Sequence, residues 1–160
     1  MGFIAGTADF MNIGIGLSKE KDPISAAREA TMLAGINLHS GKVDLAVVFS
    51  SIDLSCVSLL KTIDASLNGR VPIVGCSSAA IISNQGIFKH GLAVMLLSLP
   101  ANVYFNIAYV KDIKEKTALS AGRELGEKLL SGFRDVRRDL SVVFSDGIID
   151  EGSKLIYAVK

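Results

Sequence analysis

An internal repeat is the sequence feature that most constrains how this chain can fold. Residues 19–65 and 114–160 align without a gap at one offset of 95 residues, and they share 15 identities in 47 positions. Ordinary residue frequencies would give about three identities by chance. The matching blocks are 19–21 with 114–116, 25–29 with 120–124, and 44–50 with 139–145. We interpret the repeat as a duplication; the alternative is the general similarity of two helix–strand segments of ordinary composition.

The repeat predicts an α/β fold with a mixed parallel and antiparallel sheet flanked by helices. Its unit is β-α-β-α-β-β, with a first copy at about 12–100 and an incomplete second copy at about 103–160. The 160 residues have the length of one ordinary domain, and we expect a single domain over 1–160. An incomplete second copy leaves a sheet edge uncovered, which folded proteins usually avoid. We therefore expect a fragment or shortened relative of a longer protein, and self-association could cover the edge.

Local patterns place the expected elements. Asp22 and Pro23 begin a helix that runs to about Leu38, since Asp accepts amide hydrogens of a first helical turn and Pro lacks one. The apolar run at 43–49 predicts a strand that is buried on both faces. Strands at 87–88, 91–99 and 103–110 have no helix between them, which predicts an antiparallel meander. The other expected elements are strands at 12–17, 71–74 and 140–144 and helices at 54–67, 115–130 and 151–160.

Composition excludes several classes of protein. A net charge of +1 argues against nucleic-acid binding, for which a basic surface would be expected. Two cysteines form no disulfide framework and no four-ligand zinc site, and two isolated histidines show no metal-ligand spacing. The longest apolar stretch, at 91–99, is about half of the ~20 residues that a membrane-spanning helix needs. We expect a cytoplasmic protein without a cofactor, a metal or a membrane segment.

The order of motifs along the chain resembles that of the FIST N-terminal domain. The shared motifs are Gly14–Ser18, the alanine-rich helix after it, Val48–Ser51, Val71–Ser78, the strand at 91–99, and Val142–Gly147. The family commonly reads Gly-Cys-Ser-Thr-Ala-Gly-Glu, and here Ser78–Ile81 replaces the last four of these residues. The resemblance implies a sensory module that binds amino acids or similar metabolites and acts with a signalling domain or partner protein. It does not imply catalysis.

Seven polar side chains lie at or just past the carboxyl ends of expected strands. Open α/β sheets bind ligands at this edge, where strand ends and helix N-termini present free amides and hydroxyls. A small polar or anionic metabolite would suit such a crevice. The alternative is that a serine after a strand only caps the next helix. The candidate ligand-binding residues are Ser50, Ser51, Cys76, Ser77, Ser78, Ser145 and Asp146.

Catalysis has little support in the sequence. Gly75–Ala79 is similar to the turn that carries a nucleophilic serine, except that Ala replaces the last Gly. His39 precedes that turn. His90 follows it, and no acidic residue is suitably placed between the turn and His90. For Cys76 a buried structural thiol is more plausible than a reactive one, because reactivity requires access and a lowered pKa. We therefore expect no enzyme.

Two functions remain open. The first is a cytoplasmic sensory domain that binds a small metabolite and shifts between two arrangements in signal transduction. The second is a protein–protein interaction module on the same scaffold without a small-molecule ligand. The replacement of the family's Gly-Glu pair after Ser78 slightly favours the second function.

Overall fold

A computed structural model describes residues 10–131, 140–145 and 152–159. The chain divides into two compact units, one that ends at Val103 and one that begins at Tyr104. The first unit contains the elements β1 (Asn12–Ser18), α1 (Pro23–Leu38), β2 (Leu45–Ser51), the 3-10 turn η1 (Ile52–Leu54), α2 (Val57–Ser66), β3 (Ile73–Ser78), β4 (Ile81–Ser83), β5 (Gly86–Phe88) and β6 (Leu92–Ser98). The second contains η2 (Ile113–Glu115), α3 (Ala118–Ser131) and α4 (Gly152–Ala158).

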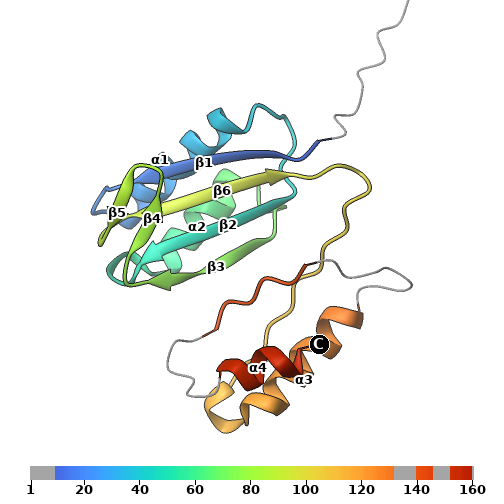
Figure 1. The fold of residues 1–160 in the computed structure, drawn as a ribbon. Coiled ribbons are helices and arrows are strands. Elements are labelled where there is room, and N and C mark those ends of the chain that lie inside the picture. Colours follow the sequence, from blue (N-terminus) through green and yellow to red (C-terminus); the bar gives the residue numbers. More distant parts are fainter. Residues whose placement is uncertain (1–9, 132–139, 146–151, 160) are drawn as a thin grey trace, which may run out of the picture. The chain divides into compact units, whose positions relative to one another are not determined.

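The sheet of the first unit is mixed, with the strand order β1-β6-β2-β3 (Figure 1). β2 and β3 are parallel, whereas β6 is antiparallel to both of its neighbours, β1 and β2. The expected α/β class with a mixed sheet flanked by helices is therefore confirmed. β4 and β5 form a separate two-stranded hairpin.

The expected meander is wrong. β5 pairs with β4, and β6 lies between β1 and β2 instead of beside β5. Residues 103–110 form no strand, and neither do residues 140–144. In the first unit β1 and β2 each pair with β6 and not with one another. The described part of the second unit holds no strand.

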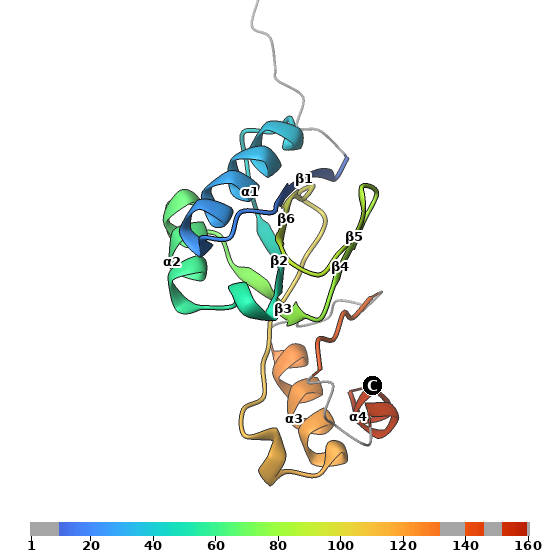
Figure 2. The ribbon, with the colours of Figure 1, turned by 90° about the vertical axis from the view of Figure 1, so that its left-hand side faces the viewer.

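Helices α1 and α2 cover one face of the sheet, and the β4–β5 hairpin lies on the other (Figure 2). Small residues let α1 approach β1 closely. A Cβ at Gly16 would lie 1.9 Å from the carbonyl oxygen of Ala30, so no larger residue fits there. The core between the helices and the sheet contains Ala30, Ala34, Val94 and Leu96, all nearly inaccessible to solvent.

Helix α1 begins as its sequence predicts. The Asp22 side chain accepts a hydrogen bond from the Ser25 amide at 2.8 Å, and Pro23 is the first helical residue. His39 ends the helix in the left-handed conformation with φ 50°.

The second unit is a pair of packed helices. A Cβ at Gly122 of α3 would lie 2.5 Å from the carbonyl oxygen of Leu155 in α4, so the two helices approach closely at that glycine. Ala121 and Leu155 are buried in the small core between them. Helices α3 and α4 begin 95 residues after α1 and α2 begin. The duplication itself stays a prediction.

Candidate functional site

The strand-end pocket lies between the sheet and the N-terminus of α2. It has a volume of about 190 Å³. The carboxyl ends of the parallel strands β2 and β3 meet the start of α2 there, which is where open α/β sheets place their ligands. Its lining residues are Val48, Ser50, Ser55, Cys56, Leu59, Leu60, Ile73, Val74, Gly75, Cys76 and Ser77.

Three of the expected site residues, Ser50, Cys76 and Ser77, line the strand-end pocket. Ser50 lies opposite Ser77 in the parallel register, and alternation along β2 puts Ser50 on the same face as the buried residue Val48. Ser50 is only 6% exposed, and its hydroxyl has no hydrogen-bond partner among the described residues. The Ser50 oxygen is not fully buried, so it opens into the pocket, where water or a ligand can bind it.

Ser51 and Ser78 have structural roles instead. The Ser51 hydroxyl accepts a hydrogen bond from the Gly91 amide at 3.1 Å, and the Ser78 hydroxyl donates to the Ala80 carbonyl at 2.8 Å. Ser51 precedes η1 without capping it through its side chain. Neither serine therefore caps a helix in the way that the alternative interpretation of these serines required.

The remaining expected site residues lie in the second unit. Ser145 is exposed at the end of the segment 140–145, which forms no strand. Asp146 lies outside the described residues. The structure therefore brings together three of the seven candidates.

Cys76 is exposed, so the interpretation of this residue as a buried structural thiol is wrong. Alternation along β3 turns successive side chains to opposite faces, and β3 is at an edge of the sheet. Ser77 shares the face of Ser50 on the helix side, so Cys76 turns to the face that α1 and α2 do not cover, which the apolar sequence around Cys76 did not reveal.

The sequence interpretation missed Ser55 and Cys56 in this pocket. It placed the start of the second helix at 54, whereas α2 begins at Val57 and Cys56 occupies its N-cap position. The pKa of the Cys56 thiol is lowered, first by the Ser58 hydroxyl, whose oxygen lies 3.1 Å from Sγ, and then by the Leu59 amide. A prediction that the second helix begins at Val57 would have placed Ser55 and Cys56 before the helix, at the strand edge where the site was expected.

A polar cluster lies at the same end of the sheet. His90 Nδ1 lies 2.5 Å from Asp53 Oδ2, and His90 Nε2 lies 3.2 Å from the Glu20 carbonyl oxygen. Both ring nitrogens face acceptors, so the imidazolium can donate to both. Asp53 first and the Glu20 carbonyl second raise the pKa of His90. The cluster ties together the segments after β1, after β2 and before β6, and no local sequence signal points to it.

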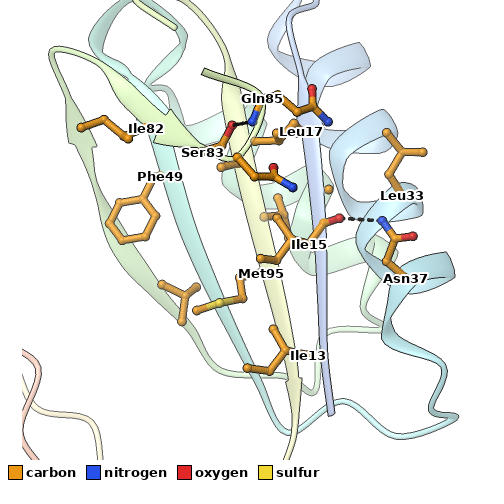
Figure 3. A pocket seen from close by; sticks show the side chains of 15 residues that line it. Ile13, Ile15, Leu17, Leu33, Asn37, Phe49, Ile82, Ser83, Gln85 and Met95 are labelled. Atoms are coloured by element: carbon orange, nitrogen blue, oxygen red, sulfur yellow. Dashed lines mark hydrogen bonds between the residues drawn. The ribbon is translucent and has the colours of Figure 1, made fainter. Parts of the chain in front are cut away.

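The sheet-face pocket extends from the face of the sheet opposite to α1 and α2, past the edge strand β1, to Leu33 and Asn37 of α1, and it has a volume of about 740 Å³ (Figure 3). Ile13, Ile15, Phe49 and Met95 contribute apolar side chains, and the hairpin tip contributes the polar residues Ser83 and Gln85. Ile15 is 51% exposed. In the apolar run at 43–49, predicted to be buried on both faces, Val48 is 4% exposed on the helix side and Val47 is 9% exposed on the opposite side, where Phe49 is only partly buried.

Within the described residues, no group of three or more His, Cys, Asp or Glu side chains could hold a metal ion. In the same part of the chain, no helix is long and apolar enough to cross a lipid bilayer.

Comparison with known proteins identifies the family. The family model described as the FIST N domain matches residues 44–160, which is well over half of the chain. No curated protein matches the sequence. The match includes β2, α2, β3 and β6, and therefore every residue that lines the strand-end pocket. The chain belongs to the FIST N-domain family, a family of sensory domains in signal transduction.

Proposed function

We propose that the chain senses a small polar or anionic metabolite that binds in the strand-end pocket. The observation that carries this proposal is the Ser50 hydroxyl, which lines the pocket beside the N-terminus of α2 and has no hydrogen-bond partner among the described residues. A ligand carboxylate could accept a hydrogen bond from this hydroxyl. The first amides of α2 have no partner within the helix, and they favour negative charge.

The size of the pocket restricts the ligand. Drug-sized ligands occupy pockets of roughly 300–1,000 Å³, and the strand-end pocket has about 190 Å³. Its lining contains no Asp, Glu, Lys or Arg side chain, so the ligand would meet hydroxyls, thiols, backbone groups and apolar side chains such as those of Leu59 and Ile73. An amino acid or a short organic acid has suitable size and charge. No residue of the pocket suggests a catalytic role, and we propose no enzyme activity.

Ligand binding could be transmitted through the elements that form the pocket. A ligand there would contact β2, β3 and the start of α2 together, and thus favour whichever arrangement of these elements binds it better. A signalling domain or a partner protein in the cytoplasm would respond to that shift in population.

A thermal-shift screen with amino acids and short carboxylic acids tests the proposal. A ligand at 100 times its Kd adds about 2.7 kcal/mol to the free energy of unfolding. We expect Ser50→Ala to abolish the shift, and Ser66→Ala, at the exposed far end of α2, to preserve it. Absence of a shift with every compound would contradict ligand sensing. An unchanged shift in Ser50→Ala would place the ligand elsewhere.

A protein-interaction module is the second candidate, and the sheet-face pocket is the observation that favours it. Ile13 and Ile15 are both more than two-fifths exposed there, and exposed apolar patches commonly mark interfaces. A second copy of the chain is the partner we would test, by sedimentation of the unmodified chain and of Ile15→Asp. A concentration-dependent dimer that Ile15→Asp dissociates would support it, and a monomer at all concentrations would contradict it.

A further inference from the structure

Cys56 occupies an unusual position for a cysteine. It is the N-cap residue of the ten-residue helix α2, with φ −152° and ψ 163°. Cys56 also lines the strand-end pocket. A side chain at an N-cap lies beside backbone amides that have no partner in the helix, and these amides stabilise negative charge. The position therefore favours a thiolate.

The neighbours of Cys56 reinforce this effect. The Ser58 oxygen lies 3.1 Å from Sγ and can donate a hydrogen bond to a thiolate. The Ser58 hydroxyl and the Leu59 amide lower the pKa of the thiol, whereas partial burial and the charge of Asp22, in the turn before α1, act in the opposite direction. The pocket lining brings no further charged side chain near Sγ.

The pocket around Cys56 has the features of a site for a small molecule. Ser50 also lines it, is 6% exposed, and has no hydrogen-bond partner among the described residues. Cys56 itself is only partly buried, so a reagent that enters the pocket can reach it. A polarised thiol and an unpartnered hydroxyl thus meet in one small cavity.

We propose that Cys56 is a site of covalent modification by small carbon electrophiles that enter the strand-end pocket. In the reaction with a haloacetamide, the Sγ proton passes to solvent and the sulfur lone pair attacks the halide-bearing carbon. The carbon–sulfur bond forms while the carbon–halogen bond breaks, and halide leaves with the bonding electrons. The adduct would fill the pocket and block the ligand. Only this regulatory consequence rests on the proposed function.

Single-cysteine variants of the full chain test the reactivity. Cys76→Ser retains Cys56, and Cys56→Ser retains Cys76, which is exposed on the edge strand β3 and does not cap a helix. The rate of alkylation by iodoacetamide would be measured by intact-mass spectrometry at about pH 7 and at about pH 9. We expect the ratio of the Cys56 rate to the Cys76 rate to rise at least about threefold as pH falls, because thiolate is the nucleophile. A constant ratio, or an unreactive Cys56, would overturn the proposal.

A second pair of variants, made in the Cys76→Ser background, separates activation from simple access. Ser58→Ala removes the hydroxyl beside Sγ, and Ser66→Ala removes a hydroxyl at the other end of α2. We expect Ser58→Ala to slow alkylation of Cys56 at least about threefold at about pH 7, with little effect at about pH 9. Ser66→Ala should match its parent at both values. Equal rates for the two variants would reject the activation.

The outcomes also separate this inference from ligand sensing. If Cys56 is unreactive while an amino acid still shifts the melting temperature through Ser50, only the covalent chemistry fails. If Cys56 reacts as expected while no metabolite shifts the melting temperature, the proposal of ligand sensing fails and the modification site stands.

Discussion

Ser51 and Gly91 exchange two hydrogen bonds at the point where β2 ends and β6 is about to begin. The Ser51 amide donates to the Gly91 carbonyl at 2.9 Å, and the Ser51 hydroxyl accepts from the Gly91 amide at 3.1 Å. The neighbouring Ser50 hydroxyl faces the strand-end pocket and has no such partner in the part of the chain that the structure describes. Of these two consecutive serines, one therefore holds the loop before β6 in place, whereas the other presents its hydroxyl to the pocket.

Replacing each of these serines by alanine should separate the two functions. Ser51→Ala leaves the buried Gly91 amide without an acceptor, so we expect the free energy of unfolding to fall by about 1–3 kcal/mol. Ser50→Ala removes a hydroxyl that forms no hydrogen bond with any described residue, so stability should stay within about 0.5 kcal/mol of the parent. Urea denaturation of both variants measures the difference. A larger loss in Ser50→Ala than in Ser51→Ala would contradict the assignment.

The contact between His90 and Asp53 predicts how stability depends on pH. Asp53 and the Glu20 carbonyl raise the pKa of His90 in the folded state, so its contribution is complete below the ordinary histidine pKa and is lost as pH rises through the folded value. The Ser51 hydroxyl and then His90 lower the pKa of Asp53, so its contribution is lost as pH falls through that lowered value. The pair should therefore stabilise most between about pH 4 and about pH 6.5.

Melting temperatures of His90→Asn and of the unmodified chain test this window. We expect the unmodified chain to be more stable than the variant at about pH 6, and the difference to shrink by about pH 8.5. His39→Asn is the matched control, because Asn tolerates the left-handed conformation at the end of α1. A difference between His90→Asn and the unmodified chain that does not change with pH would show that the ion pair contributes nothing.

Glycine at position 16 is required by close packing. A Cβ there would lie 1.9 Å from the Ala30 oxygen and 2.5 Å from the Ala34 nitrogen, and both atoms are backbone atoms that cannot easily move. We expect Gly16→Ala to destabilise the first unit by at least about 2–3 kcal/mol. Gly35→Ala, in the exposed interior of α1 with nothing within 4 Å of the new Cβ, should stabilise it by roughly 0.5–1 kcal/mol. Thermal unfolding followed by circular dichroism would show shifts of opposite sign, and shifts of the same sign would contradict the packing.

Two adjacent leucines of β6 test which face of the sheet holds the core. Leu96 is 1% exposed on the helix side, whereas Leu97 is partly exposed and points to the opposite face. We expect Leu96→Ala to lower the free energy of unfolding by about 2–5 kcal/mol, and Leu97→Ala to lower it by no more than about 1–2 kcal/mol. Chemical denaturation gives both values. Similar losses of unfolding free energy in the two variants would mean that the face opposite to α1 and α2 is buried to the same degree as the helix side.

Much of the fold could be predicted because its signals are local. Asp22 and Pro23 mark the start of α1, and the apolar run that contains Val48 marks β2. The strand partners could not be predicted, because hydrogen bonds between strands join residues far apart in the sequence. The sequence therefore suggested a strand at 103–110, where the structure shows none.

The sequence by itself determined the class of the fold, the family, and the strand edge at which Ser50 and Ser77 lie. The order of motifs along the chain indicates the family, and residue spacing and helix-capping chemistry, which are local properties, indicate the fold class and the strand edge. Only the tertiary structure decided that Ser50 faces a pocket while Ser51 holds Gly91, that Cys56 caps α2 beside that pocket, and that Asp53 meets His90. These contacts depend on the direction in which each side chain leaves the sheet and on where distant loops meet, and neither is encoded within a short stretch of sequence.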